Sequence, residues 1–251
     1  MHLTFSDKER QMKLRAIYDH ESQVFGPEFL GIISQINRSA LELKNRLGIV
    51  DASIVERSAE ILNTVLYDSV ELSFWIYVIE LKRYIGWLFD HSINVALISL
   101  FIASRMNYDS KLMSHIALGG FLHDIGKISI PKEIILKPGK LDKNEMTLMQ
   151  NHCRTGYSMV SNLGLSQESL NIILHHHERM DGSGYPFGLT GDKLSDGAKI
   201  AMIADSLDAM TSPRPYQQIK TTSEAITDLF NYKNAYCNEL LSILPSFFCK
   251  K

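Results

Sequence analysis

The stretch KLMSHIALGGFLHDIGKISIP, residues 111–131, decides the fold. Its first half is apolar at helical spacing, and Gly126 followed by Pro131 predicts where this helix stops. The pair His123 and Asp124 lies near that stop, and a helix end is where two adjacent side chains can approach one metal ion. By itself the pair is a weak signal, because a histidine on an apolar helix is more often a hydrogen-bonded core residue.

Helical spacing also dominates the rest of the chain. No run of alternating residues bounded by turn residues predicts a strand, so we expect an all-α fold. Helices are predicted over residues 27–48, closing on Gly48, and over residues 54–66. The pattern changes after these two helices. We therefore expect a small helical regulatory or dimerisation segment, residues 1–66, followed by a larger domain, residues 67–251.

The composition is that of an ordinary globular protein. Of the 251 residues, 45% are hydrophobic and 22% are charged, and the net charge of -2 argues against a nucleic-acid polymer as partner. Three scattered cysteines without a CxxC pair do not make a disulfide framework and favour a reducing cytoplasm. The apolar run LSFWIYVIELKRYIGWLF is interrupted by Glu80, Lys82 and Arg83, so we expect no membrane segment.

Asp205 is the second residue that indicates a bound cation. It interrupts the apolar run KIAMIADSLDAM, where an unpaired buried carboxylate would be costly. A salt bridge to a lysine or arginine explains Asp205 equally well when it is considered alone. Asp208 lies three residues further on, on a neighbouring helix face, where it could cap or pair locally.

Histidines in three other segments complete a possible ligand set. His91 opens another apolar helix and His152 lies in MTLMQNHCRTGYSMV, so each could also be an ordinary surface residue. His176 and His177 follow the apolar run LNIIL, and packing alone explains them poorly because a buried imidazole needs partners on both nitrogens. Nitrogen and oxygen donors without thiolate suit two iron or manganese ions bridged by one carboxylate. Such a centre favours phosphoester hydrolysis by a metal-bridging hydroxide.

Six motifs in one order extend this interpretation to a known family. The motifs are HSINVA (91–96), FLHDIGKISIP (121–131), LKPGKL (136–141), MQNHCRTG (149–156), HHERMDGSGYPFGLTG (176–191) and AKIAMIADSLDAMTSPRPY (198–216). Together they resemble the HD-GYP family, a branch of the HD phosphohydrolase superfamily. The resemblance covers about residues 67–220.

The resemblance implies an HD-type helical bundle and a cytoplasmic, metal-dependent phosphodiesterase. Its expected substrate is the bacterial second messenger cyclic di-GMP, opened to pGpG and in some members to GMP. Its expected cofactors are two divalent metal ions, iron or manganese, with Asp124 as the bridging, catalytic carboxylate. The implied metal ligands are His91, His123, Asp124, His152, His176, His177 and Asp205.

The resemblance also implies substrate contacts. Lys127 matches the family's HDxGK lysine and would bind the scissile phosphate or assist the leaving oxygen, although a helix C-terminal lysine is the plain alternative. Arg214 would hold a substrate phosphate or guanine edge, unless it is a simple loop arginine. In the DGSGYP loop, Gly184 and Tyr185 are expected to lie against the substrate pocket, and Tyr185 is not expected to be catalytic.

The chain departs from the family pattern at two site positions. Some members have a glutamate four residues before the first histidine, which supports a third metal, and this chain has Trp87 there. The lysine that often follows RPY is Gln217, which removes one cation from substrate binding. The alternatives are a catalytically weak cyclic dinucleotide receptor or a hydrolase of another cyclic dinucleotide, such as a hybrid cGAMP. The sequence leaves room for a homodimer and for signalling partner proteins.

Overall fold

The computed structural model describes residues 26–213, 218–232 and 234–247, and this part of the chain is built from helices without a strand. The all-α prediction is therefore confirmed for the described residues. Arg214 and Gln217, which the sequence places at the substrate, lie outside them. The elements, with η marking 3-10 helices, are α2 (Gly26–Leu47), α3 (Ala52–Asp68), α4 (Trp75–Tyr84), α5 (Gly86–Ala103), α6 (Ser110–Leu122), η1 (Ile125–Ser129), α7 (Lys132–Ile135), α8 (Lys143–Gln150), α9 (His152–Val160), α10 (Gln167–His175), η2 (Gly191–Lys193), α11 (Asp196–Thr211), α12 (Thr222–Asn231), α13 (Asn238–Ile243) and η3 (Leu244–Phe247).

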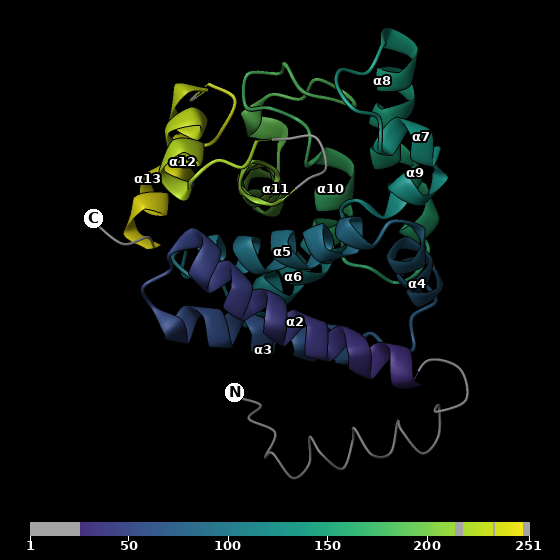
Figure 1. Ribbon diagram of the computed structural model, residues 1–251. Helices are drawn as coiled ribbons and strands as arrows, with labels where there is room; N and C mark the ends of the chain where they lie inside the picture. Colours follow the sequence, from purple (N-terminus) through teal and green to yellow (C-terminus); the bar gives the residue numbers. More distant parts are fainter. Residues whose placement is uncertain (1–25, 214–217, 233, 248–251) are drawn as a thin grey trace.

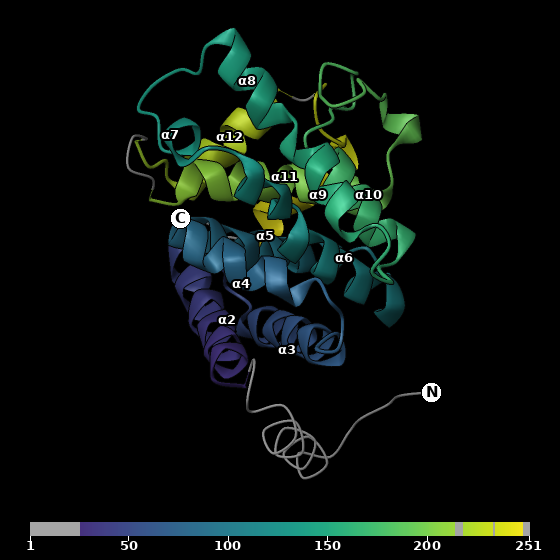
Figure 2. The same ribbon diagram turned by 90° about the vertical axis from the view of Figure 1, so that its right-hand side faces the viewer.

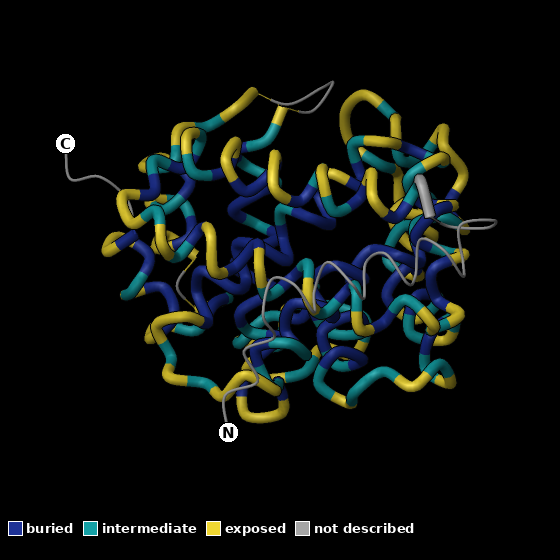
Figure 3. Tube along the Cα trace, turned by 90° about the horizontal axis from the view of Figure 1, so that it is seen from below, coloured by how far each residue is buried: buried dark blue, intermediate teal, exposed yellow. Residues whose placement is uncertain are grey.

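The helices lie in three tiers. Figures 1 and 2 show α2 and α3 on one side, α5 and α6 in the middle, and α9, α10 and α11 on the other side. The buried positions gather inside the molecule, and the exposed ones follow its outer surface (Figure 3). Because α5 packs against both α6 and α11, side chains of α5 can reach a site between the middle tier and the tier of α9, α10 and α11.

The middle tier is centred on α5. This helix, Gly86–Ala103, is long and apolar enough to cross a membrane by length and composition, but 78% of it is buried inside the fold. A helix that is apolar on every face is what the centre of a helical bundle requires. Gly120 of α6 allows close packing here, because a Cβ at this position would lie 3.1 Å from the Cα of Ala96. α5 is thus the central helix of the core, and most of its side chains are buried.

The two N-terminal helices pack onto the same core. α2 buries Phe29, Ile32, Ile36 and Leu43, which share one helix face. It ends just before Gly48, which has a φ of 69°, as the predicted closing glycine requires. The apolar side chains of α2 and α3 belong to one cluster with those of α5 and α6, so the apolar core is continuous across the predicted boundary. The regulatory or dimerisation role of the first segment stays a prediction.

The end of α6 differs from the prediction. The helix ends at Leu122, before the predicted stop at Gly126, and His123 and Asp124 lie in the turn that leads to η1. The physical reason is a close backbone approach: a Cβ on Gly126 would lie 2.0 Å from the carbonyl oxygen of His152. The chain therefore leaves the helix early and runs against the start of α9. This turn lets two sequence neighbours point into the same site.

Candidate metal centre

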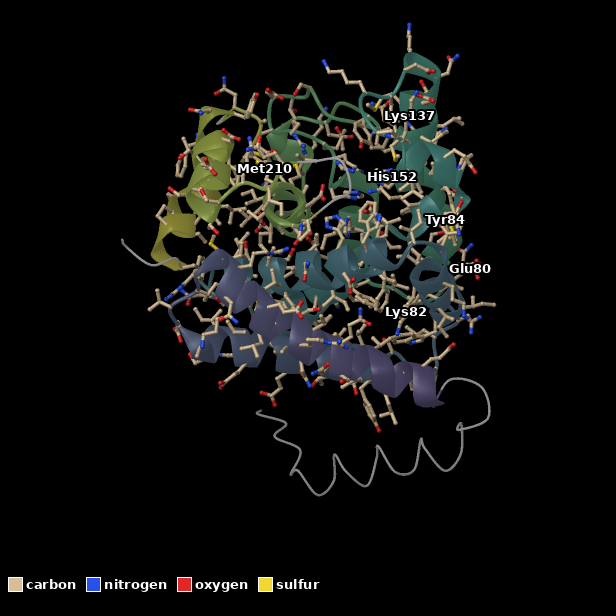
Figure 4. The ribbon with its side chains drawn as sticks, in the orientation of Figure 1. Glu80, Lys82, Tyr84, Lys137, His152 and Met210 are labelled. Atoms are coloured by element: carbon tan, nitrogen blue, oxygen red, sulfur yellow. The ribbon has the colours of Figure 1, made fainter. Side chains whose placement is uncertain are left out.

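The seven predicted ligands come together from five separate segments. Their donor atoms form two adjacent groups, and within each group all atoms lie within 4.8 Å of one another. The first group is Asp124, His152, His176 and His177, and the second group is His91, His123 and Asp205. Figure 4 labels His152, which lies toward the middle of the molecule from α9. We call these seven residues the His/Asp cluster.

The carboxylate of Asp124 lies between the two groups. Its Oδ1 is 3.3 Å from His152 Nε2 and 3.8 Å from His176 Nε2. Its Oδ2 is 3.4 Å from His123 Nε2 and 3.7 Å from His91 Nε2. Each oxygen thus faces a different pair of imidazoles, which is the arrangement that a carboxylate shared by two ions needs.

Asp205 closes the second side of the cluster. Its Oδ1 is 3.1 Å from His91 Nε2, and its Oδ2 is 3.7 Å from His177 Nδ1. The alternative explanation of Asp205, a salt bridge to lysine or arginine, is not seen among the described residues. Asp205 therefore faces only imidazoles and lies where it can connect the two groups.

Four of the five histidines use their second nitrogen to fix the orientation of the ring. Because a carbonyl or carboxylate oxygen only accepts, Nδ1 must carry a proton, and Nε2 points into the cluster. The acceptors are Asp208 Oδ2 for His91 (2.6 Å), Gly120 O for His123 (2.7 Å), Met149 O for His152 (2.6 Å), and Ile172 O and Ile173 O for His176 (3.1 Å each). Nε2 is therefore the nitrogen that each of these rings would offer to a metal ion.

Burial and charge set the protonation of the cluster. Burial lowers the pKa of His176 and of His177 well below the ordinary histidine value, which keeps both rings neutral. Burial alone would raise the pKa of Asp124, but the ammonium of Lys127 and the contacts with His123 and His152 together outweigh burial and hold the pKa well below the usual range. Lys127 Nζ lies 2.6 Å from Asp124 Oδ2. Neutral imidazoles and ionised carboxylates are the forms that bind metal.

Two buried atoms of the cluster have no hydrogen-bond partner among the described residues. They are His123 Nε2 and Asp124 Oδ1. A buried polar atom left without a partner costs about 1–3 kcal/mol, so native proteins rarely keep one without a reason. Divalent cations bound in the two groups would give each of these atoms a partner and remove that cost. The donor set, its protonation and these two atoms therefore fit a metal centre.

Two histidines are not the surface residues that each could also have been. His91 does not open its helix: α5 begins at Gly86, so His91 lies in its second turn and is buried. His152 does not face solvent, because a bend at Asn151 separates α8 from α9 and turns the imidazole inward. His175 lies outside the cluster, with its ring against Phe187 at a centroid distance of 5.9 Å. Its separation from the His176–His177 pair agrees with the sequence interpretation.

The DGSGYP loop lies beside the cluster. The ring of Tyr185 stacks on His177 at a centroid distance of 4.7 Å. A Cβ on Gly184 would lie 2.4 Å from the backbone of Glu178, so packing alone explains this glycine. Glu178, which sequence reasoning missed, is fully buried and accepts from the backbone N–H of Phe187 (2.7 Å) and of Leu189 (2.9 Å). Its position directly after the ligand pair was the available signal.

Asp208 has two partners that sequence reasoning missed. Its carboxylate pairs locally with the Ser212 hydroxyl at 2.8 Å, as the sequence allowed, and it also accepts from His91 Nδ1 at 2.6 Å and from Arg46 Nη2 of α2 at 2.5 Å. Burial alone would raise the pKa of Asp208. The hydrogen bond to His91 and the charge of Arg46 together outweigh burial, and the pKa is lowered to about 2. Asp208 interrupts the same apolar run as Asp205, and that interruption was the signal. The N-terminal helix α2 thereby reaches a candidate metal ligand through one carboxylate.

Comparisons with known proteins agree with this architecture. The model of the HD domain family matches residues 79–239. The cyclic di-GMP phosphodiesterase PA4108 of Pseudomonas aeruginosa is 37% identical over 150 residues, which cover 59% of this chain and 36% of that protein. The 3'3'-cGAMP-specific phosphodiesterase 1 of Vibrio cholerae is 36% identical over 139 residues, which cover 55% of this chain and 32% of that protein. The chain thus spans about a third of the length of these relatives.

A solved structure shows the same fold. Bd1817 of Bdellovibrio bacteriovorus, an HDG"Y"P protein, superposes with a TM-score of 0.59 at 18% identity, covering 96% of this chain and 80% of that chain. This similarity concerns the fold, and it confirms the expected HD-type bundle. The match of the family model over residues 79–239 shows that the chain belongs to the HD domain family.

Proposed function

We propose that this chain is a metal-dependent phosphodiesterase that hydrolyses cyclic di-GMP to pGpG, with GMP as a possible later product. The observation that carries the proposal is the convergence of four histidine Nε2 atoms and two carboxylates on one buried space. The similarity to PA4108, a cyclic di-GMP phosphodiesterase, supports the choice of substrate. Cytoplasmic location remains part of this proposal.

The His/Asp cluster would hold two divalent ions, iron or manganese. Its donors are nitrogen and oxygen without thiolate, which favours these metals over a structural zinc site. Asp124 would be the ligand shared by both ions, because its two oxygens face different imidazole pairs. When bound, the metals would supply Lewis-acid activation of water and of a phosphoryl oxygen.

The protein's own groups would position the substrate. Lys127 pairs with Asp124 of the cluster, and its ammonium could bind the scissile phosphate or assist the leaving oxygen. Tyr185 would keep His177 in place by stacking. Arg214 remains the proposed phosphate or guanine contact from outside the described residues.

The experiment is anaerobic reconstitution with Fe(II) or Mn(II), followed by chromatography of products from cyclic di-GMP. Wild type is expected to form pGpG, and His123→Ala or Asp124→Ala is expected to abolish turnover. Arg57→Ala, an exposed change on α3, is the control and is expected to retain activity. Tight binding of cyclic di-GMP without turnover by the metal-loaded wild type would indicate the weak receptor instead.

A second candidate substrate has its own support. The similarity to a 3'3'-cGAMP-specific phosphodiesterase makes a hybrid cyclic dinucleotide the alternative. The two substrates differ in one base and share the phosphodiester linkage, so the proposed metal chemistry is the same for both. Parallel kcat/KM measurements on cyclic di-GMP and 3'3'-cGAMP decide between them, and faster turnover of the hybrid would move the assignment.

A further inference from the structure

A polar pocket adjoins the His/Asp cluster and reaches the N-terminal helix. Its volume is about 510 Å³, and α2, α5 and the end of α11 supply its lining. His91 belongs both to the pocket wall and to the cluster, and the other six cluster residues do not line the pocket. The pocket lies beside His91 together with Asp208, the partner of its Nδ1. No residue of the DGSGYP loop lines this pocket. A substrate that passes His91 from the cluster would reach α2 here.

The charges of the pocket decide which part of a substrate it fits. Its ionisable lining consists of two cations, Arg38 and Arg46, and three anions, Glu42, Asp90 and Asp208. The lining is negative by one charge when His91 is neutral, which disfavours a second phosphate. A neutral group that both donates and accepts hydrogen bonds suits the pocket better.

Most of these charges already have partners. Asp208 pairs with Arg46, and Asp90 accepts a hydrogen bond from Gln35. Arg38 and Glu42 are exposed and take part in no ion pair in the described part of the chain. They are one turn apart on α2, on neighbouring positions of the same face. The pocket thus presents one guanidinium fork beside one carboxylate.

This pair matches the hydrogen-bonding edges of guanine. Arginine donates in a bidentate manner to guanine O6 and N7, and a carboxylate accepts from guanine N1–H and N2–H₂. Adenine offers neither O6 nor the N1–H and N2–H₂ donors. Trp87, which also lines the pocket, provides an aromatic surface on which a base could stack.

Resting on the proposed function, we infer that this pocket binds a guanine base of the substrate, with Arg38 and Glu42 as its specificity residues. The segment that the sequence assigned to regulation or dimerisation would then supply part of the substrate site. It would also explain how a chain with Trp87 and Gln217 at family positions keeps polar contacts to a nucleotide.

Two measurements on metal-loaded protein test this inference. Calorimetric titration with GMP and with AMP measures base preference directly, and wild type is expected to prefer GMP by about tenfold or more. Arg38→Gln and Glu42→Gln are expected to lose most of that preference and to lower kcat/KM for cyclic di-GMP by a similar factor. Bis(p-nitrophenyl) phosphate has no purine, so both variants should turn it over within about twofold of the wild-type rate.

Matched controls on α3 separate the pocket from general surface charge. Arg57→Gln and Glu56→Gln change the same residue types at exposed positions outside the pocket and should keep the GMP preference. An unchanged GMP preference in both α2 variants, with an active wild type, overturns this inference and leaves the proposed function intact. Absence of turnover of both diesters by the metal-loaded wild type overturns the proposed function itself, whatever the base preference.

Discussion

Replacing Asp208 by asparagine tests whether the contact behind His91 matters for metal binding. The substitution keeps the shape of the side chain but removes its charge. The contacts at stake are His91 Nδ1 at 2.6 Å, Arg46 Nη2 at 2.5 Å and the Ser212 hydroxyl at 2.8 Å. Asp208→Asn weakens the acceptor that fixes the proton on His91 Nδ1, and it leaves Arg46 without its carboxylate partner.

The structure sets the size of the expected effect. Loss of a carboxylate behind a metal-bound histidine typically costs about 10–100-fold in metal affinity. Stability should fall as well: a pKa lowered from the ordinary 3.8 to about 2 corresponds to about 2 kcal/mol near neutral pH. Because the folded pKa is below the unfolded one, this stability is present above pH 3.8 and is lost as pH falls toward 2. Asparagine has no such pH dependence.

The assay pairs metal competition with equilibrium unfolding. Metal affinity is measured by titration against a competing chelator, and unfolding free energy is measured on metal-free protein between pH 7 and acid. The control is Asp196→Asn, an exposed change at the start of the same helix, where no loss of metal affinity is expected. Metal affinity of Asp208→Asn within about twofold of wild type would refute the argument, since the smallest expected loss is about tenfold.

Three further predictions concern packing, the loop and the metals. Gly126→Ala places a Cβ 2.0 Å from the carbonyl oxygen of His152, so the free energy of unfolding should fall by about 1–3 kcal/mol or more, and metal binding should weaken. The control is Gly86→Ala, whose Cβ would have no atom within 4 Å. It should change neither the free energy of unfolding nor the metal affinity. Glu178→Gln replaces one of two acceptor oxygens by an amide group, so hydrogen exchange at Phe187 or Leu189 should become faster, and unchanged exchange at both would disprove the role of Glu178. Chelation of metal-loaded protein should lower the melting temperature, with recovery on adding Fe(II) or Mn(II), because ligands of the folded state stabilise it; an equal melting temperature before and after chelation would contradict a bound metal.

The sequence was most informative where residue chemistry conflicted with local burial. His176 and His177 after an apolar helix, and Asp205 within one, were anomalies that a core could not explain, and the structure brings all three to one site. Helix periodicity likewise predicted α2 and its closing glycine, because its apolar residues repeat on one face. Each of these features could be recognised because the residues that reveal it are close together in the sequence.

Contacts between distant segments were beyond sequence reasoning. The pairing of Asp208 with His91 and Arg46 joins residues 117 and 162 positions apart, and nothing local distinguishes it from a helix cap. The end of α6 was predicted too late, because the constraint on Gly126 comes from the backbone of His152. Both misses have the same cause: the partner group lies on another helix, and only the fold brings it near.

The central claim, a two-metal phosphodiesterase centre in this His/Asp cluster, is tested most directly by one paired measurement on anaerobically reconstituted protein. Metal content per chain and conversion of cyclic di-GMP are determined on the same sample, for wild type and for Asp124→Ala. Wild type is expected to hold two ions per chain and to form pGpG, and the variant is expected to lose both. Wild type that binds no stoichiometric metal, or that converts cyclic di-GMP equally well with Asp124 replaced, would contradict this claim.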